Sequence, residues 1–246
     1  MIPPDRPRVL VVDDEQDTCS NMSDILFDLG YRVDSACDGA SALAMVRQQP
    51  YDVALLDLRM PGMDGLTLYR EIKRLRAGTV AILVTAYAGG TTADEALAAG
   101  AWRVVAKPVH LPGLIDLVDK AHGQPLVLVV DDDRELCENL WQILRDRGYR
   151  VALAHDAAGA AEQLRGATVR VALIDMALPG GDGGDVFRLV READPGARTV
   201  LITGRRPETD PLVERVLAEG ADATCYKPFD VPRLLDMLNR MAESPG

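Results

Sequence analysis

Short apolar runs alternate with amphipathic stretches along the whole chain. The runs "VLVV", "VALL" and "AILVT", and the "VV" before Lys107, contain no alternation of polar and apolar residues, which predicts strands buried on both faces. The stretches between them have helical spacing, and "DGASALAMVRQQ" begins with Asp38 as a predicted helix cap. Two of these stretches each predict one apolar helix face, formed by Cys19, Met22, Ile25, Leu26 and Leu29 and by Leu136, Leu140, Ile143 and Leu144. Strands and helices alternating at this length predict a parallel sheet with helices on both faces.

The same pattern occurs twice. "RVLVVDDEQDTCSN" at Arg8 returns as "LVLVVDDDRELCEN" at Leu126, and "VALLDLRMPGMDG" at Val53 returns as "VALIDMALPGGDG" at Val171. Subtracting 13 from 131, 57 from 175 and 85 from 203 gives a period of 118 residues each time, whereas 107 to 227 is 120, so two residues are inserted after Thr203. A period this long indicates duplicated domains rather than a solenoid. The sequence predicts one domain over residues 7–122, a short linker at 123–125 and a second domain over 126–243.

Composition narrows the class of protein. Hydrophobic residues make up 48% of the 246 residues and charged residues 26%, as in ordinary soluble globular proteins. No apolar run approaches the roughly 18 residues of a membrane span, and the N-terminus lacks the apolar core of a signal peptide, so we expect a cytoplasmic protein. A net charge of −11 disfavours direct nucleic-acid binding, which needs a basic face. The 4 cysteines have no CxxC spacing, so we expect reduced structural thiols rather than a zinc site or a redox pair.

Polar residues stand where the predicted strands end, and ligands bind beyond the carboxyl ends of the strands in sheets of this kind. In the first copy the strand ends carry Asp13, Asp14, Asp57, Thr85 and Lys107. Three carboxylates in one crevice repel one another, and Mg²⁺, which prefers carboxylate, carbonyl and water oxygens, would relieve that repulsion. The equivalent residues of the second copy are Asp131, Asp132, Asp175, Thr203 and Lys227.

With a cation in place, one carboxylate can act as a nucleophile towards phosphorus. Phosphoryl transfer also needs positive charge on the phosphoryl oxygens, which the cation and a lysine at a strand tip can supply. Most basic residues of the chain are arginines, so a lysine at the equivalent place in both copies indicates a need for a compact charge on a flexible stem. Taken singly, an aspartate pair could cap a helix and a Lys-Pro pair could be a loop. Four such elements in the same order, twice over, favour a duplicated site.

Both halves resemble the receiver domains of response regulators in bacterial two-component signalling. The resemblance covers nearly the whole chain and is carried by "VVDDE" and "VVDDD", "DLRMPGMDG" and "DMALPGGDG", the two threonines, and "KP" twice. It implies two flavodoxin-like (βα)₅ domains, each with a five-stranded parallel sheet in the order 2-1-3-4-5. It also implies that Asp57, Asp175 or both accept phosphate from a histidine kinase or a phosphotransfer protein.

The resemblance further implies the ligands of the cation, Mg²⁺ or Mn²⁺. In the first copy these are Asp14 and Asp57, with Asp13 acting through water and the Arg59 carbonyl as a third ligand. Lysine and threonine would contact the phosphoryl group, and the Lys-Pro bond is typically cis in this family. The corresponding metal ligands of the second copy are Asp132, Asp175, Asp131 and the Ala177 carbonyl. The groups that face the phosphoryl group are Thr85 and Lys107 in the first copy and Thr203 and Lys227 in the second.

The sequence departs from the family where a switch aromatic normally stands three residues before the lysine. Val104 and Thr224 occupy that position, which puts the usual route from the site to the surface in doubt in both copies. Trp102 and Tyr226 lie nearby at the wrong offset, so we interpret them as packing residues.

The residues that flank the path of attacking water in this family also differ between the copies. They are Arg59 and Tyr87 in the first and Ala177 and Arg205 in the second. We therefore predict different lifetimes for the two phosphoryl groups, with Tyr87 shielding the first. Equal dephosphorylation rates in separately purified halves would contradict this prediction.

Several functions remain open at this point. The leading hypothesis is a stand-alone tandem receiver that acts through contacts with other proteins. It is not expected to be an enzyme beyond self-catalysed phosphotransfer and slow autodephosphorylation. A homodimer would form through the face of the fourth helix, fifth strand and fifth helix of one domain. Alternatives are a regulatory module of a larger kinase or effector, or a pseudo-receiver adaptor in one half. A phosphatase of the haloacid-dehalogenase type needs a second aspartate where Arg59 and Ala177 stand. A flavodoxin is disfavoured because a carboxylate-lined pocket would repel the flavin phosphate.

Overall fold

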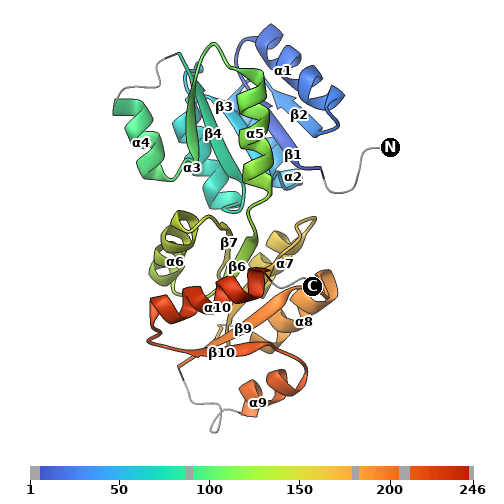
Figure 1. Cartoon of the computed structure of the whole chain (residues 1–246), viewed down its shortest axis with the longest axis vertical. Helices are drawn as coiled ribbons and strands as arrows, with labels where there is room; N and C mark the ends of the chain where they lie inside the picture. The colour runs from blue at the N-terminus through green and yellow to red at the C-terminus, as the bar shows by residue number, and fades with distance from the viewer. Residues whose placement is uncertain (1–5, 87–90, 179–182, 205–210, 244–246) are drawn as a thin grey trace. The chain divides into compact units, whose positions relative to one another are not determined.

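Strands and helices alternate through the computed structural model, as the apolar pattern predicts (Figure 1). The structure describes residues 6–86, 91–178, 183–204 and 211–243. Contacts between residues divide the chain into two units, Met1–Gln124 and Pro125–Gly246. Each unit is built from the same succession of βα pairs, so the repeat in the sequence is also a repeat in structure.

In the first unit each strand is followed along the chain by a helix. Its elements are β1 (Arg8–Val12), α1 (Gln16–Asp28), β2 (Arg32–Ala36), α2 (Gly39–Gln48), β3 (Val53–Asp57), α3 (Gly65–Leu75), β4 (Val80–Thr85), α4 (Thr91–Ala99), β5 (Arg103–Ala106) and α5 (Leu111–His122).

The second unit follows the same plan. Its elements are β6 (Leu126–Val130), α6 (Arg134–Asp146), β7 (Arg150–Ala154), α7 (Ala157–Leu164), β8 (Val171–Asp175), α8 (Gly183–Ala193), β9 (Arg198–Thr203), α9 (Pro211–Ala218), β10 (Ala223–Tyr226) and α10 (Val231–Glu243).

Each unit has one five-stranded sheet in which all strand pairs are parallel. The strand order is β2-β1-β3-β4-β5 in the first unit and, read from the equivalent edge, β7-β6-β8-β9-β10 in the second. The expected order 2-1-3-4-5 is therefore confirmed in both units. The second strand lies on one side of the first strand, and the third strand lies on the other side. In doubly wound sheets, ligands bind in the crevice at this switch point.

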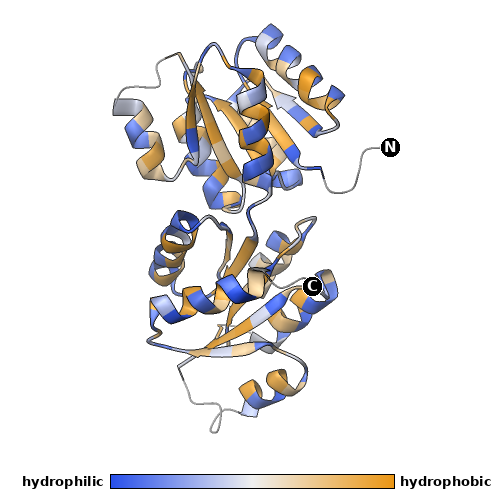
Figure 2. Ribbon diagram, in the orientation of Figure 1, coloured by the Kyte–Doolittle hydropathy of each residue, from blue (hydrophilic) through white to orange (hydrophobic). Residues whose placement is uncertain are grey.

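Strand β1 shows how the sheet is covered on both faces. Val9 and Val11 belong to an apolar cluster with residues of α1 and α5, such as Leu26 and Leu114. Leu10 and Val12 face the other way, into a cluster with residues of α2, α3 and α4. Figure 2 shows the result as apolar strands beneath helices whose outer faces are mostly polar. Burial on both faces explains why the central strands contain almost no polar residue before their last position.

Two details of the predicted pattern are wrong. The "VV" of β5 was expected to be fully buried, but Val104 and Val105 are only half-buried because β5 is an edge strand. Leu29, expected on the apolar face of α1, is 44% exposed because it stands at the C-terminal cap of the helix, beyond the last buried turn. The predicted cap at Asp38 is confirmed, since its side chain accepts a hydrogen bond from the Ser41 amide.

None of the helices in the described parts of the chain has the length and apolarity that crossing a membrane requires.

Candidate functional site

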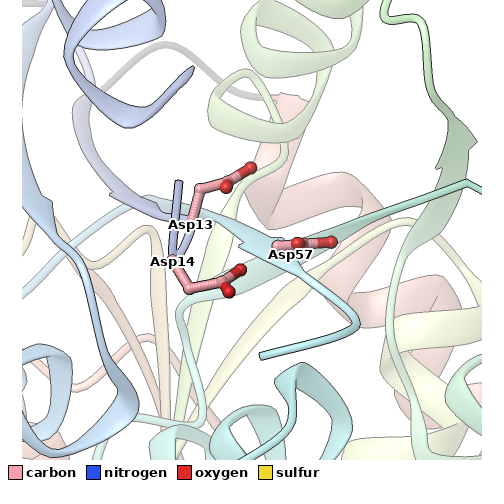
Figure 3. Close-up of side chains that lie close together, drawn as sticks. All are labelled: Asp13, Asp14 and Asp57. Carbon is pink, nitrogen blue, oxygen red and sulfur yellow. The ribbon is translucent and has the colours of Figure 1, made fainter. Parts of the chain in front are cut away.

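In the first unit, three carboxylates meet beyond the carboxyl ends of β1 and β3 (Figure 3). Asp13 and Asp14 directly follow β1, and Asp57 is the last residue of β3, its neighbour in the sheet. One carboxylate oxygen from each of the three lies within 4.8 Å of the others. Asp13 is 6% exposed and Asp57 8%, whereas Asp14 faces solvent. Two nearly buried carboxylates this close together need a compensating positive charge.

Lys107 supplies that charge in the structure. Its Nζ donates a hydrogen bond to Asp13 Oδ2 over 2.8 Å and lies 3.2 Å from Asp57 Oδ2. The lysine directly follows β5, its amide donates to the Thr85 carbonyl over 2.7 Å, and the bond to Pro108 is cis. The sheet therefore brings together side chains from the ends of three strands that lie far apart in the sequence.

Backbone amides satisfy the remaining oxygens of the two buried carboxylates. The Glu15 amide donates to Asp13 Oδ1 over 3.0 Å, and the Arg59 amide donates to Asp57 Oδ1 over 3.4 Å. This puts the Arg59 backbone, whose carbonyl is a predicted metal ligand, next to the Asp57 carboxylate. The carbonyl's role as a ligand stays a prediction.

The buried groups of the first site have shifted affinities for protons. Burial raises the pKa of Asp57, and the adjacent Lys107 offsets only part of that effect. Burial also acts to lower the pKa of Lys107, but its contacts with Asp13 and Asp57 outweigh burial and raise it. The lysine is therefore held in its charged form against the two carboxylates.

The second unit repeats the arrangement with a tighter ion pair. Lys227 Nζ lies 2.6 Å from Asp131 Oδ2 and 2.8 Å from Asp175 Oδ2, and its bond to Pro228 is cis. Asp131 is 0% exposed and Asp175 4%, so this lysine neutralises carboxylates that are almost completely removed from water. The Asp133 amide donates to Asp131 Oδ1 and the Ala177 amide to Asp175 Oδ1.

Electrostatics in the second site follow the same causes. Burial raises the pKa of Asp131, and Lys227 offsets part of the rise. For Lys227, burial acts to lower the pKa, but hydrogen bonds to Asp131 and Asp175 outweigh it and raise the pKa.

Both carboxylate clusters fit a hard divalent cation. In the second unit, oxygens of Asp131, Asp132 and Asp175 also lie within 4.8 Å of one another, with the same pattern of two buried groups and one exposed group. Mg²⁺ binds through a small number of carboxylates and keeps several waters, and the exposed aspartate leaves the site open to water and to a further ligand. The donor set therefore suits Mg²⁺ or Mn²⁺ better than a soft metal, which would need cysteine or histidine ligands.

The threonines and the positions of the missing aromatics lie on the fourth and fifth strands of each sheet. Thr85 and Thr203 end β4 and β9 and are 1% and 3% exposed. Val104 is paired with Leu83 across the strands and packs against the apolar core, and Thr224 is paired with Leu201. Neither position carries a ring that could turn between an inner and an outer orientation.

The two aromatics near these positions behave differently. Trp102 packs against the apolar cluster beneath α1 and α5, which confirms its interpretation as a packing residue. The same interpretation is wrong for Tyr226, which is 38% exposed because it ends the edge strand β10. Tyr87 and Arg205, invoked in the lifetime prediction, and most of the inserted segment after Thr203 lie outside the described residues.

Sequence reasoning passed over Gly65 and Gly183, which both begin the helix after the site. A Cβ on Gly65 would lie against the Asp57 carbonyl oxygen and 3.0 Å from Leu58 Cα, and a Cβ on Gly183 would lie 2.5 Å from the Asp175 carbonyl oxygen. Only glycine allows the helix to start this close to the strand. The signal was present in the repeat, since "MDG" and "GDG" end in glycine at equivalent positions.

Comparison with known proteins identifies relatives of both halves and of the whole chain. The family model for the response regulator receiver domain matches residues 9–119 and again 127–239. The response regulator receiver protein Anae109_2439 of Anaeromyxobacter sp. (strain Fw109-5) is 35% identical over 239 residues, which cover 97% of each chain. The transcriptional regulatory protein ZraR of Escherichia coli K12 is 39% identical over 113 residues, and that match spans 46% of this chain but only 26% of ZraR.

Two solved receiver-domain structures each match about half of the chain. The response regulator TrrA of Thermotoga maritima, in complex with Mg²⁺ and BeF, is 34% identical, with a TM-score of 0.43 over 47% of this chain and 98% of that chain. The receiver domain of the sensor histidine kinase PA1611 of Pseudomonas aeruginosa, with magnesium in its active-site cleft, is 30% identical, with a TM-score of 0.44 over 48% of this chain and 99% of that chain.

Proposed function

Because the chain belongs to the response regulator receiver domain family and carries two such domains in tandem, we propose that it accepts phosphoryl groups on Asp57, Asp175 or both in a two-component relay. One observation carries this proposal. In each unit a lysine from the end of the fifth strand bonds a buried aspartate from the first strand and another from the third, beside an exposed third carboxylate.

The proposed chemical step uses the aspartate as a nucleophile. A carboxylate oxygen of Asp57 attacks phosphorus of a phosphohistidine on a kinase or phosphotransfer protein, and a P–O bond forms. The P–N bond breaks, its electron pair stays on the histidine nitrogen, and that nitrogen takes up a proton. Asp175 would react in the same way in the second unit.

The surrounding residues supply charge and position. A cation bound by Asp14 and Asp57, with Asp13 through water, would neutralise charge on the phosphoryl oxygens. Lys107 reaches the same place, because its Nζ already lies 3.2 Å from an Asp57 oxygen. Thr85, at the end of the neighbouring strand, would donate its hydroxyl to another phosphoryl oxygen, and Lys227 and Thr203 would have these roles in the second unit.

We propose that the chain serves as a phosphoryl acceptor in the cytoplasm and not as a multiple-turnover enzyme, with output through contacts with other proteins. A regulatory module of a larger kinase or effector, or one half that acts as an unphosphorylated adaptor, is the second candidate. It is favoured by the ZraR match, in which a receiver of this kind makes up only 26% of the protein. The genes that adjoin the coding sequence would distinguish a stand-alone receiver from a module of a larger kinase or effector.

Phosphorylation by a small-molecule phosphodonor with Mg²⁺, followed by intact mass, tests the proposal directly. We expect the wild-type chain to gain up to two phosphoryl groups, Asp57→Asn and Asp175→Asn to gain one at most, and the double variant to gain none. Asparagine keeps the size of the side chain, so we expect folding to be preserved. Its amide is not a nucleophile and cannot accept the phosphoryl group. A double variant that still gains phosphate would show that the acceptor assignment is wrong, and a wild-type chain that gains none would leave two pseudo-receivers.

Metal binding can be tested separately from phosphorylation. We expect Mg²⁺ to raise the Tm of the chain, because a ligand that binds only the folded state stabilises it. Removing one of the carboxylate ligands with Asp14→Asn should weaken the affinity of the first site about tenfold. Asp24→Asn removes an exposed carboxylate of α1 that is not part of the cluster and serves as the matched control. Thermal unfolding measures the Tm, and calorimetric titration measures the affinities for Mg²⁺. Equal affinities in Asp14→Asn and Asp24→Asn would contradict the ligand assignment.

A further inference from the structure

Two cysteines lie beside the carboxylate site of the first unit. Cys19, on α1, is buried, and Cys37, directly after β2, is exposed. Cys19 Sγ lies 3.5 Å from the carbonyl oxygen of Ala36, the residue that precedes Cys37. Burial raises the pKa of Cys19, and the electrostatic effect of the nearby Cys37 thiol raises it further. The two side chains therefore belong to one small region, although 18 positions separate them (37 minus 19).

In the second unit, the side chains at the two equivalent positions reach the same backbone oxygen. Cys137 and His155 are the equivalent residues, because 137 minus 19 and 155 minus 37 both give 118. Cys137 Sγ donates to the Asp131 carbonyl oxygen over 3.3 Å, and His155 Nδ1 lies 3.0 Å from the same oxygen. Two side chains that reach one atom are close to each other. The first unit has cysteine at both positions, and there Cys19 Sγ contacts the carbonyl oxygens of Ala36 and Val11 instead.

We propose that Cys19 and Cys37 form a reversible intramolecular disulfide when the chain meets a peroxide or a comparable two-electron oxidant. The exposed Cys37 sulfur attacks a peroxide oxygen, the O–O bond breaks, and Cys37 becomes a sulfenic acid with release of water. The Cys19 sulfur then attacks the Cys37 sulfur, the S–S bond forms, and the sulfenic oxygen leaves as a second water. Two thiols and one peroxide thus give one disulfide and two waters.

Exposure assigns the order of the two steps. An oxidant reaches Cys37 first because its side chain faces solvent, whereas Cys19 is 1% exposed. Cys19 is then the resolving thiol, held near Cys37 by its contact with the Ala36 carbonyl. The spacing of cysteines along the sequence gives no sign of this pair, because the fold and not the sequence brings the two positions together.

The disulfide would modify only the first unit. In the second unit histidine replaces one of the two cysteines, and the remaining Cys137 is completely buried. The modified place adjoins the carboxylate site, since the Ala36 carbonyl also accepts a hydrogen bond from the Asp13 amide over 3.3 Å. The two units of one chain would therefore differ in their response to oxidation.

Peptide mapping of the full chain tests the proposal without relying on phosphorylation. The reduced protein is treated with hydrogen peroxide, its remaining thiols are alkylated, and the digest is analysed by mass spectrometry without reductant. We expect 2 of the 4 thiols to be lost to alkylation, a Cys19–Cys37 linked peptide to appear, and dithiothreitol to remove it.

Matched variants decide the outcome. Cys37→Ser, at an exposed position, should abolish the linked peptide, and Cys225→Ser, which removes a half-buried thiol of β10, should leave it unchanged. The proposal is overturned if Cys37 is recovered as sulfinic acid or as a disulfide between two chains while Cys19 remains alkylated. It is equally overturned if oxidation links another pair of cysteines in preference to this one.

Discussion

Replacing Gly65 by alanine is expected to destabilise the first unit by roughly 3 kcal/mol, a large effect for the addition of one methyl group. The new Cβ would lie against the Asp57 carbonyl oxygen, 2.9 Å from the Asp57 carbonyl carbon and 3.0 Å from Leu58 Cα. All three are backbone atoms, so no flexible side chain can move aside. Either α3 or the end of β3 must shift, and the end of β3 carries the Asp57 carboxylate. Urea or thermal unfolding measures the loss of stability.

The same change should also impair the first site while leaving the second as an internal reference. Phosphorylation at Asp57 should fall in Gly65→Ala, and phosphorylation at Asp175 should not. Gly113→Ala is the matched control, because a Cβ at this position in the first turn of α5 meets only His110 Nδ1, at 3.4 Å. If Gly65→Ala unfolds like Gly113→Ala, the close approach of α3 to β3 does not constrain the site.

The central strands could be predicted from the sequence because helices bury them on both faces. β1, β3 and β4 contain almost only apolar residues before their last position, and the same holds for β6 and β8 in the second unit. The edge strands were harder to predict. β2 has the burial of a half-exposed edge, and its sequence "RVDSA" mixes polar and apolar residues. Edge strands lack a neighbour on one side, so their sequences are less constrained by burial.

The members of the site could be predicted because each ends a strand, and parallel strands place their carboxyl ends at one edge of the sheet. The local pattern alone could not tell Asp13 from Asp14, which are adjacent and chemically identical, and only the family resemblance gave them different expected roles. In the structure Asp13 is buried and bonds Lys107, whereas Asp14 is exposed. This difference depends on which way each side chain leaves the backbone after the strand ends. The meeting of Cys19 with the backbone before Cys37 likewise depends on how α1 packs against β2, which no local pattern encodes.

Removing either strand-end lysine is expected to have the largest effect on phosphorylation short of replacing the acceptor aspartate. Lys107→Ala should slow phosphorylation of Asp57 about 100-fold, as is typical when one preorganised charged donor is removed from an active site. The experiment is best done in the Asp175→Asn background, so that Asp57 is the one acceptor under test. Rates from intact mass against time, with a small-molecule phosphodonor and Mg²⁺, measure the effect. Lys120→Ala removes a solvent-exposed lysine of α5 that pairs with Asp116 and should leave the rate unchanged.

Lys227→Ala, tested in the Asp57→Asn background, should slow phosphorylation of Asp175 similarly and reduce stability more than Lys107→Ala. Lys227 neutralises a completely buried Asp131 at 2.6 Å, whereas Lys107 bonds the slightly exposed Asp13 at 2.8 Å. A buried aspartate that loses its lysine partner destabilises the folded state. The decrease in Tm should therefore be larger where the carboxylate is more completely buried. Raising Mg²⁺ to a saturating concentration should recover part of the stability in both variants, because the ion also neutralises the cluster, but it should not recover the phosphorylation rate. Recovery of the rate as well would mean that the lysine acts only by neutralising the empty site and has no part in phosphoryl transfer.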